Sequence, residues 1–589
     1  MKTASLTLGT SRPVKVRRRA DERVILHFDY DCFYASVFEN ENPSLKSQAL
    51  GVKQKSILAT CNYVARARGV KKLMLISEAQ RLCPDLVLLN GEDLTRFRDV
   101  SKKLWAFLRA HAWSGRVERL GLDEVFLDIT DVVSYNQELL NTGALRSSFF
   151  QLDRGDPVQG FAFDGSRFHG CVRAAASSGE VVEVDVSDPL CVRLMLASHL
   201  AGYLRHKLDV DFGYTSSGGV ATNKLLAKLA GSVNKPNNQT TLLSQTDGVV
   251  EAFMDAHKIR KIPGIGSRTA QSIEDHLLSN PTAKRDREGS ITVGEVRQHP
   301  DMSAERLEQI LDRPGAERGS GAKVWNLLHG IDESEVKEAS DVPTQISIED
   351  TYMSRPLQTQ AEVSRELLAL ATSLIRRMRV DLTEADASPE TPPKPRWLAH
   401  PRTIRLSTRT KPKTSEAQTF SRASRSAALP SFVFQLPHPA TEDVAERLVT
   451  ESLLPLFRRL HPERGGGWNL ALLNICVANM AAVASGESRA PGRDIGHMFR
   501  AQGEALREWT VYDSLPASVA PGRDVDADAA WGHAGGDMRT GGEEGTSLVD
   551  EDAWEELGDV LGSPTCRVCG RAVPAFAMAA HERFHAMGE

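Results

Sequence analysis

The sequence lacks the features that mark secreted, disulfide-stabilised or membrane-spanning proteins. Only eight of the 589 residues are cysteine and six of these stand singly, whereas disulfide-stabilised domains are short and dense in cysteine. No apolar run approaches the roughly 18 residues that a membrane-spanning helix needs. The basic cluster at residues 15–19 precedes no apolar stretch, which argues against a secretory signal. We therefore expect no membrane contact and a reducing compartment.

The net charge is also small, at −5, and it is unevenly placed. Residues 503–560 hold fifteen Asp and Glu against three Lys and Arg, so the rest of the chain is net positive at +7. Residues 391–425 hold nine Lys and Arg against Glu416 alone. This density is expected of a surface that contacts nucleic-acid phosphates, and a solvated basic loop explains it equally well from charge alone.

The pattern of apolar residues predicts an α/β protein of several domains. Strands are expected at 24–28 and at 122–129, and the second of them is acidic. Residues 153–185 are rich in Gly, Ser and Asp without a sustained period, which predicts an insertion. Residues 241–338 are mostly helical in pattern, and 341–482 predict a further α/β unit.

The two ends of the chain have a different composition from the middle. Residues 1–22 are polar and basic, and residues 486–562 are acidic and rich in Gly. Both have too little apolar surface to offset the entropy of ordering, so we expect them to be disordered. This leaves a short C-terminal module at 563–589.

Three acidic residues in apolar surroundings are the first candidates for chemistry. Asp29 ends the first strand, and Asp123 and Glu124 lie in the second acidic segment. Carboxylates that gather across neighbouring strands repel one another, and a hard divalent cation such as Mg2+ relieves that repulsion. Two such ions can activate a hydroxyl nucleophile and hold a triphosphate, which is the chemistry of nucleotidyl transfer.

The spacing of these acids leaves other interpretations open. Isolated Asp-x-Asp and Asp-Glu pairs are common, and such acids also pair with arginines, here Arg116 or Arg119. Nucleases and cyclases use similar carboxylates. Because side chains alternate along a strand, Asp123 and Glu124 would point to opposite faces, so one of them is expected to reach the site from a bend.

Four segments, in order, are similar to signatures of the Y-family DNA polymerases. They are residues 27–35 (HFDYDCFYA), 60–66 (TCNYVAR), 122–128 (LDEVFLD) and 223–237, which begins Asn-Lys and ends Lys-Pro-Asn. The resemblance implies a right-hand polymerase with a helical thumb and an α/β little finger. The implied domains are a palm at 23–38 and 91–240, with the insertion at 153–185, fingers at 39–90, a thumb at 241–338 and a little finger at 341–482.

Family roles carry over to matching positions. The implied ligands of two Mg2+ ions, for which Mn2+ can substitute, are the side chains of Asp29, Asp123 and Glu124 and the backbone carbonyl of Tyr30. The implied contacts to the incoming deoxynucleoside triphosphate are Tyr34, Thr60, Tyr63, Arg66 and Lys235. An Arg fork, a Lys point charge and a Tyr hydroxyl are suited to phosphate oxygens. Tyr34 would lie under the sugar and exclude a 2′-hydroxyl. Without the motif around it, an aromatic residue at this position would be interpreted as part of the hydrophobic core. Asp31 and Asp128 are expected to support the site.

Further strings extend the resemblance over about 24–480 and place it in the iota branch of the family. They are residues 51–55, 71–74, 90–96 and 469–476. In that branch the finger residues over the nascent base pair narrow the site, and here Gln54, Lys55 and Ile57 take those places. Ser56 stands where a bulky aromatic is expected, so the base-pairing mode stays open.

Residues 262–266 (IPGIG) predict a helix-hairpin-helix in the thumb. Its Gly264 and Gly266 would let backbone amides approach a DNA phosphate, although such a turn between helices is by itself usually only a turn. The basic stretch of the little finger would then hold duplex DNA by its phosphates.

The C-terminal module has the residue types and spacing of one tetrahedral structural Zn2+ site, formed by Cys566, Cys569, His581 and His585. A DNA-reading finger is an alternative, but the expected helix at 574–585 is short of Arg or Asn at base-contact positions. The segment is similar to the ubiquitin-binding zinc finger of the eta branch. That finger has an Asp where this chain has Arg583. Arg583 argues against ubiquitin binding, whereas the rest of the resemblance implies ubiquitin or a ubiquitinated sliding clamp as a partner.

Residues and resemblance together predict a monomeric, nuclear DNA-directed DNA polymerase. It would extend a primer 3′-OH on primer–template DNA with dNTPs and bypass damaged bases in error-prone translesion synthesis. One alternative is an inactive scaffold that binds DNA and ubiquitin, against which the intact acids argue. The other is a different metal-dependent phosphoryl enzyme such as a nuclease, which has no need of Tyr34, Tyr63, Arg66 and Lys235 together.

Overall fold

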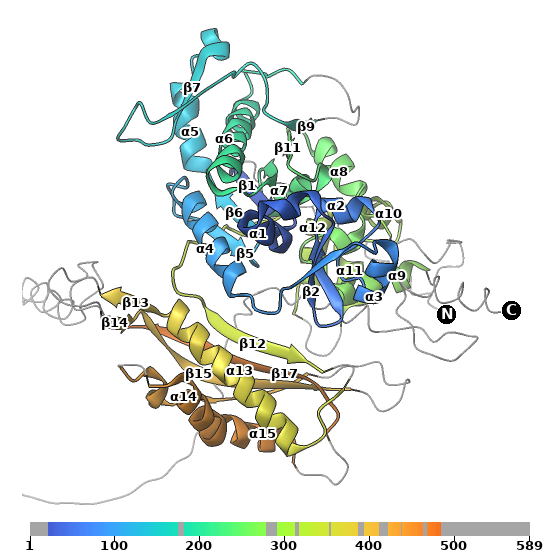
Figure 1. Ribbon diagram of the computed structural model, residues 1–589. Coiled ribbons are helices and arrows are strands. Elements are labelled where there is room, and N and C mark those ends of the chain that lie inside the picture. Colours follow the sequence, from blue (N-terminus) through green and yellow to red (C-terminus); the bar gives the residue numbers. More distant parts are fainter. Residues whose placement is uncertain are drawn as a thin grey trace, which may run out of the picture. The chain divides into compact units, whose positions relative to one another are not determined.

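The computed structural model describes residues 22–174, 182–278, 291–312, 317–352, 355–386, 394–411, 422–436, 439–462 and 468–483. These residues belong to two compact units that divide between Ala339 and Ser340. Each unit has its own β-sheet with helices packed against it (Figure 1). Within the described ranges, no helix combines the length and apolar character required to cross a bilayer.

A six-stranded sheet forms the centre of the first unit. Its strand order is β5-β6-β1-β10-β11-β9. β1 lies between β6 and β10 and runs antiparallel to both. The strands are β1 (Ile25–Tyr30), β5 (Val117–Leu120), β6 (Glu124–Asp128), β9 (Cys171–Arg173), β10 (Ser216–Ala221) and β11 (Gln239–Leu242).

The two faces of β1 belong to different cores, because side chains alternate along a strand. Leu26 and Phe28 pack in a core with helices α1 (Phe33–Glu41), α4 (Thr95–Arg109), α5 (Thr130–Leu139) and α6 (Pro189–Phe212). Ile25 packs in a second core that includes α7 (Lys224–Val233). His27 and Asp29 follow Ile25 at every second position, so they share the face that α7 covers.

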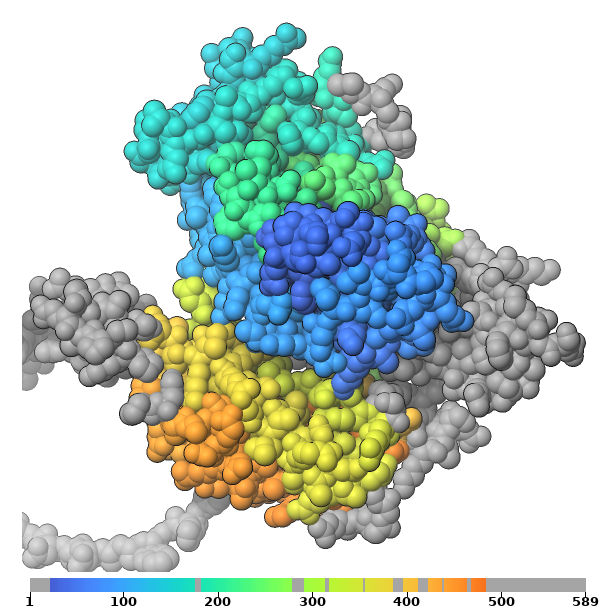
Figure 2. All heavy atoms as spheres, in the orientation of Figure 1, coloured from blue at the N-terminus to red at the C-terminus, as the bar shows by residue number. Residues whose placement is uncertain are grey.

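A smaller three-stranded sheet, in the order β3-β2-β4, follows the first helix. Its elements are η1 (Pro43–Ser47), β2 (Leu50–Gln54), β3 (Ile57–Cys61), α2 (Tyr63–Ala67), α3 (Ile76–Leu82) and β4 (Val87–Asn90). Leu58, Cys61 and Ala65 are buried in a small core of their own. In Figure 2 the blue residues of this part of the chain form a continuous surface beside the green residues of the same unit.

The described residues between 247 and 328 are mainly helical. The elements are α8 (Asp247–Asp255), η3 (Ile259–Lys261), α9 (Ser267–Leu278), α10 (Val293–Arg297), α11 (Ala304–Leu311) and α12 (Ser320–Leu328). Their apolar side chains share the second core with α7. Thr292 and Glu295 form a reciprocal capping box that begins α10.

The region of the predicted insertion has more regular structure than its lack of a period indicates. It follows η2 (Thr142–Ser147) and contributes β8 (Gly160–Phe163), which pairs with β7 (Ser148–Gln151), as well as edge strand β9. The Phe161 ring stacks between Phe150, at 5.2 Å, and Tyr203 of α6, at 4.5 Å. Stacked rings therefore hold the β7-β8 hairpin on α6.

The second unit is a four-stranded antiparallel sheet in the order β12-β17-β15-β16. Its strands are β12 (Gln345–Thr351), β15 (Ala399–Thr410), β16 (Arg422–Ala428) and β17 (Leu470–Ala482), and a separate hairpin is formed by β13 (Thr383–Asp386) and β14 (Lys394–Trp397). The helical elements are α13 (Gln360–Asp381), η4 (Ser431–Phe434), α14 (Thr441–Leu448), η5 (Val449–Leu453) and α15 (Leu454–Leu460). They share one core with the sheet.

The sheet of the second unit carries arginines where the sequence is most basic. Ile404 and Leu406 of β15 are buried, whereas Arg405 between them is exposed on the opposite face. Arg409 and Arg422 are cross-strand partners, so their side chains share that same face. This part of the unit therefore presents cationic side chains from two neighbouring strands.

Candidate active site

The three predicted metal ligands lie together where β1 and β6 pair. Asp29 and Glu124 are direct cross-strand partners. Asp123 lies before β6, in the turn that follows β5, and its carbonyl accepts a 2.9 Å hydrogen bond from the Tyr30 amide. Gly121 in that turn has φ 67°, a conformation that favours glycine. The acidic strand thus begins at Glu124, later than predicted, and the turn supplies the expected bend.

Two lysines and a histidine surround the acids. Lys235 Nζ is 2.5 Å from Asp29 Oδ2. Lys228 Nζ, from α7, is 2.7 Å from Glu124 Oε2, and His27 Nε2 is 3.6 Å from the same oxygen. Within the described residues, the ring nitrogens of His27 have no hydrogen-bond partner, so that last contact is electrostatic.

The partner suggested by sequence proximity was wrong in one case. Arg116 forms an ion pair with Glu335, at 3.1 Å, and not with the strand acids. The cations that meet the acids come instead from α7 and the segment after it, more than a hundred residues farther along the chain. The acids meet these cations because α7 packs on the face of β1 that carries Ile25, His27 and Asp29.

Burial opposes the ionisation of all three carboxyl groups, and the charges around them decide whether each pKa ends above or below its usual value. Burial raises the pKa of Asp29, and the neighbouring Glu124 charge adds to that rise. Burial, together with the charges of Asp29 and Glu124, raises the pKa of Asp123 to about 7. Burial also opposes ionisation of Glu124, but His27 and Lys228 outweigh it and lower its pKa to about 2. The acids therefore compete for the available positive charge.

The chemistry of this donor set fits a hard divalent cation. Carboxylate oxygens from Asp29, Asp123 and Glu124 and the Tyr30 carbonyl are the oxygen ligands that Mg2+ prefers. Within the described ranges, no cluster of three or more His, Cys, Asp or Glu is arranged to hold a metal as it stands. Lys235 and Lys228 each engage one of the acids, so a bound cation would compete with these ammonium groups for the same carboxylates.

Tyr63 and Arg66 project from α2 on one side of the helix. The Arg66 guanidinium lies 4.6 Å from the centre of the Tyr63 ring, and its Nε donates to the Cys61 carbonyl at 3.1 Å. Burial, and then the charge of Asp31, raises the pKa of Tyr63 to about 12. The negative charges of Asp31 and Asp29 therefore act on the Tyr63 hydroxyl, as does the Arg66 charge in the opposite direction.

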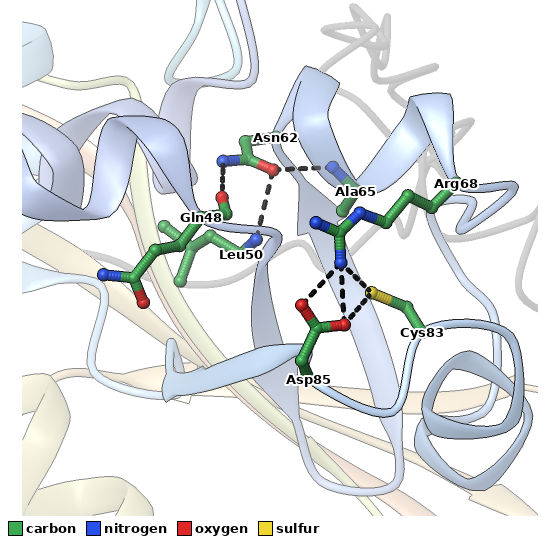
Figure 3. A network of polar contacts seen from close by, with 7 residues as sticks. All are labelled: Gln48, Leu50, Asn62, Ala65, Arg68, Cys83 and Asp85. Atoms are coloured by element: carbon green, nitrogen blue, oxygen red, sulfur yellow. Dashed lines mark hydrogen bonds and ion pairs between the residues drawn. The ribbon is translucent and has the colours of Figure 1, made fainter.

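Asn62 fixes the start of α2 through four hydrogen bonds, and Figure 3 shows those to Gln48, Leu50 and Ala65. Its Oδ1 accepts from the backbone amides of Leu50, at 3.1 Å, and Ala65, at 3.0 Å. Its Nδ2 donates to the Gln48 carbonyl, at 2.8 Å, and to Glu39 Oε1, at 2.7 Å. A buried amide with every donor and acceptor used holds α2 against β2 and α1.

Figure 3 also shows how the residue after α2 is held. Arg68 Nη1 lies 2.7 and 2.6 Å from the two carboxylate oxygens of Asp85 and 3.5 Å from Cys83 Sγ. Both ends of the short helix that carries Tyr63 and Arg66 are therefore tied to neighbouring segments. Short helices gain most of their stability from such contacts.

The remaining nucleotide-site candidates lie around these elements. The Tyr34 ring of α1 stacks on Phe97 of α4 at 4.3 Å and an angle of 21°. Thr60 lies on β3 opposite Val52 of β2. Tyr34 is thus placed by α1, which follows β1, and Thr60 is placed by β3.

Gln54, Lys55 and Ile57 lie at the β2-β3 hairpin. Gln54 Nε2 donates to the Gly91 carbonyl at 2.9 Å. The Lys55 amide donates to Glu92 Oε1 at 3.0 Å, and Lys55 has φ 51°, the left-handed region found in tight turns. Ile57 begins β3. Contacts to residues 91–92 therefore set the shape of this hairpin.

Gly264 and Gly266 lie in the turn between η3 and α9. Gly264 has φ 87°, and the Ile265 amide donates to the Ile262 carbonyl at 3.0 Å. The Gly266 carbonyl accepts the first helical hydrogen bond, from Ala270, at 2.9 Å. The predicted turn between two helical segments is thus present, with its first glycine in a conformation that other residues rarely adopt.

Of the two acids expected to support the site, Asp128 lies away from it. Asp128 is at the opposite end of β6 from Glu124, four residues or roughly 13 Å along the strand. Its Oδ1 accepts from the Thr130 hydroxyl at 2.6 Å and the Thr130 amide at 3.1 Å, which begins α5. Asp31, in contrast, lies directly after β1.

Two residues of the site were missed by the sequence analysis. Lys228 lies one helical turn after Lys224 on α7, a spacing that places both on one face of the helix. Asn62 precedes α2 with the residue type preferred for a helix N-cap, which was an available signal. The predicted zinc ligands Cys566, Cys569, His581 and His585 lie outside the described residues, as do residues 1–21, 486–562 and 563–589.

Comparison with known proteins gives matches over both units. Residues 28–232 match the impB/mucB/samB family, and residues 343–490 match the impB/mucB/samB family C-terminal domain. The chain is 32% identical to DNA polymerase iota of Homo sapiens over 480 residues, which cover 82% of this chain and 55% of the human protein. It is 34% identical over 368 residues to DNA polymerase iota of Drosophila melanogaster, covering 62% of this chain and 43% of that protein.

A bacterial relative matches along a larger share of its own length. The chain is 29% identical over 335 residues to DNA polymerase IV of Mannheimia succiniciproducens, covering 56% of this chain and 70% of that protein. By contrast, the chain spans about half the length of the iota relatives that it matches.

Proposed function

Since this chain belongs to the impB/mucB/samB family, the Y-family of DNA polymerases, we propose that it is a template-directed DNA polymerase. It would add deoxynucleotides to a primer 3′-OH and bypass damaged template bases in error-prone translesion synthesis. The observation that carries the proposal is the meeting of Asp29, Asp123 and Glu124 with Lys235 at one end of β1. Carboxylates for cations and an ammonium for phosphate are both needed for nucleotidyl transfer.

In this proposal the acids and the cationic side chains divide the work. Asp29, Asp123, Glu124 and the Tyr30 carbonyl would hold two Mg2+ ions. When bound, such ions lower the pKa of a hydroxyl nucleophile and neutralise charge that develops on the phosphates. Lys235 would leave Asp29 and bind the triphosphate, with Arg66 and Tyr63 on α2 contacting the same group.

Other residues would orient the nucleotide and the DNA. Tyr34 would lie under the sugar, Thr60 beside the triphosphate, and Gln54, Lys55 and Ile57 over the nascent base pair. Gly264 and Gly266 would offer backbone amides to a DNA phosphate. The arginines on β15 and β16 would add contacts to the duplex backbone. Because its substrate would be chromosomal DNA, the enzyme would act in the nucleus. It would act there as a monomer.

Primer extension by the full chain tests this proposal. Wild-type protein with Mg2+ and all four dNTPs is expected to extend a primer on an undamaged template and on one with a damaged base. Extension should require the template, because the proposal is templated synthesis rather than addition to free ends. Shortening of the primer without extension would favour a nuclease, and a complete lack of added nucleotide with Mg2+ and with Mn2+ would rule the polymerase out.

We further propose that the C-terminal module binds one Zn2+ through Cys566, Cys569, His581 and His585, and that it binds ubiquitin, free or attached to a sliding clamp. The support for zinc is the type and spacing of these residues, and the support for ubiquitin is the similarity of the segment to a ubiquitin-binding zinc finger. Cys569→Ala is expected to remove the bound zinc and abolish ubiquitin binding, while primer extension persists. Cys171→Ala, a cysteine of β9 outside the module, should keep both. Ubiquitin binding that survives Cys569→Ala with zinc lost would assign the interaction to another segment.

A further inference from the structure

Asp31 is buried directly beside the acids, and the proposed chemistry does not use it. Its side chain is 4% exposed. Oδ1 accepts a 2.7 Å hydrogen bond from the Ser217 hydroxyl, and Oδ2 accepts a 2.8 Å hydrogen bond from the backbone amide of Asn237. Both oxygens are therefore engaged within the protein, which distinguishes Asp31 from Asp29 two residues earlier.

The two partners of Asp31 belong to different parts of the site. Ser217 lies on β10 and is the cross-strand partner of Asp29, so it is a fixed point of the sheet. Asn237 lies in the segment between α7 and β11, two residues after Lys235. Asp31 thus connects the rigid sheet to the segment that carries the lysine at Asp29.

A second anchor holds the same segment from its other side. Asn237 Oδ1 accepts a 2.6 Å hydrogen bond from Arg205 Nη2, and Arg205 Nε donates to the Ser216 carbonyl at 2.8 Å. Asn237 has φ 43°, which is uncommon for a residue other than glycine. The backbone here is thus held in an infrequent conformation by contacts at its amide and at its side chain.

We propose that Asp31 is a positioning residue that sets the affinity for the nucleoside triphosphate by fixing the segment that carries Lys235. The inference rests on the proposed function, because it gives Lys235 a phosphate to bind. A charge-assisted bond from a carboxylate to a backbone amide is stronger than a neutral one. Without it, the Lys235 ammonium is no longer held at a defined place, and ordering it on the phosphates costs additional entropy.

The test is a double-mutant cycle with Asp31→Ala, Lys235→Ala and the combined variant, measured as KM for dNTP and kcat at saturating primer–template. Asp31→Ala is expected to raise KM roughly tenfold, with a smaller change in kcat, as expected when binding is weakened. In the Lys235→Ala background, Asp31→Ala should raise KM less than about twofold, since residues that act through one another are not additive. Full additivity, or an unchanged KM in Asp31→Ala, would overturn the proposal.

The conservative variant separates positioning from charge. In Asp31→Asn the amide can turn so that its oxygen still accepts from the Asn237 amide while its nitrogen donates to the Ser217 hydroxyl, which accepts as well as donates. Asp31→Asn should therefore recover most of the tenfold rise in KM, and the remainder reports the weaker, neutral hydrogen bond. If Asp31 instead bound metal, this variant would shift the Mg2+ dependence at saturating dNTP, and that result would contradict the proposal.

Two further variants keep the test decisive. Asp128→Ala removes an equally buried carboxylate that holds two hydrogen bonds far from Lys235, so it should lower Tm without raising KM. If Asp31→Ala does not fold, Asn237→Gly removes the Arg205 anchor while glycine tolerates φ 43°, and it should raise KM without adding to Lys235→Ala. Wild-type protein that adds no nucleotide would refute the polymerase proposal itself, whereas an active wild type with additive variants would refute only the role of Asp31.

Discussion

Asp123→Asn is expected to abolish primer extension while leaving the protein as stable as the wild type, or more stable. Asparagine has the shape of aspartate without its charge, so two acids remain where three are proposed to hold cations. Loss of one such ligand should slow extension at least about a thousandfold, because the electrostatic stabilisation of the transferred phosphate depends on the bound ions. Extension rates under single-turnover conditions measure this effect.

The stability of Asp123→Asn follows from the raised pKa of Asp123. An acid whose folded-state pKa lies above its unfolded value destabilises the fold as pH rises toward that pKa, and the cost is complete above about 7. Removal of the carboxylate removes this cost, so Tm measured in chelator above that pH should not fall. The rise of Tm with added Mn2+, a binding effect, should shrink in the variant. A Tm rise with Mn2+ equal to that of the wild type would exclude Asp123 as a ligand.

Asp128→Asn is the matched control for Asp123→Asn. It changes the same residue type at the other end of β6, where the carboxylate holds Thr130 and lies roughly 13 Å from Glu124. We expect a lower Tm and normal extension. Asp123→Asn should therefore lose activity and keep its stability, whereas Asp128→Asn should lose stability and keep its activity.

Tyr34→Ala is expected to admit ribonucleotides. If the Tyr34 ring lies under the sugar, its removal opens space for a 2′-hydroxyl, and the preference for dNTP over NTP in kcat/KM should fall roughly a hundredfold. Incorporation of each nucleotide opposite the same template base measures the ratio. An unchanged ratio in an active variant would remove Tyr34 from the role of sugar gate.

Phe38→Ala is the control for Tyr34→Ala. Phe38 lies one turn farther along α1 and also packs on Phe97, with ring centres 5.7 Å apart, so its removal disturbs the same aromatic cluster. Both variants should lose stability through the vacated space. Only Tyr34→Ala should change sugar discrimination, since four residues along the helix place Phe38 roughly 6 Å farther along its axis.

The sequence predicted those parts of the site that depend on local pattern. The apolar spacing of residues 94–109 predicts a helix, and the structure has α4, Thr95–Arg109, there with its apolar side buried. The conflict between strand alternation and the neighbouring Asp123 and Glu124 indicated a bend. It did not indicate which acid leaves the strand, because that depends on how the turn at Gly121 packs.

The cationic side chains that neutralise the acids could not be predicted from the local sequence pattern. Lys228 and Glu124 are 104 residues apart and meet only because α7 packs on one face of β1. Arg116, which is nearer in sequence, is instead paired with Glu335, a partner even more remote along the chain. Long-range pairing of this kind is decided by the arrangement of elements, and ion pairs contribute little to that arrangement.

The predicted insertion illustrates a different limit. Phe161 and Phe163 are apolar residues in a segment dominated by Gly, Ser and Asp, so no period emerges from the sequence. Their partners are rings on α6 and β7, and stacking needs only a few residues in the right place. Short elements held by a few large contacts are therefore the ones that a periodicity argument overlooks.

The contact between Lys235 and Asp29 has a thermodynamic consequence. The Lys235 ammonium contacts this carboxylate at 2.5 Å, and an anion from solution that binds the same ammonium would weaken that contact. An anion that draws the lysine away leaves the acidic side with more uncompensated charge and so increases its affinity for cations. Because linkage is reciprocal, a bound cation must increase the affinity for the anion by the same factor. If Asp29 holds metal and Lys235 holds the triphosphate, as proposed, the pair would make the loading of metal and of nucleotide mutually reinforcing rather than independent.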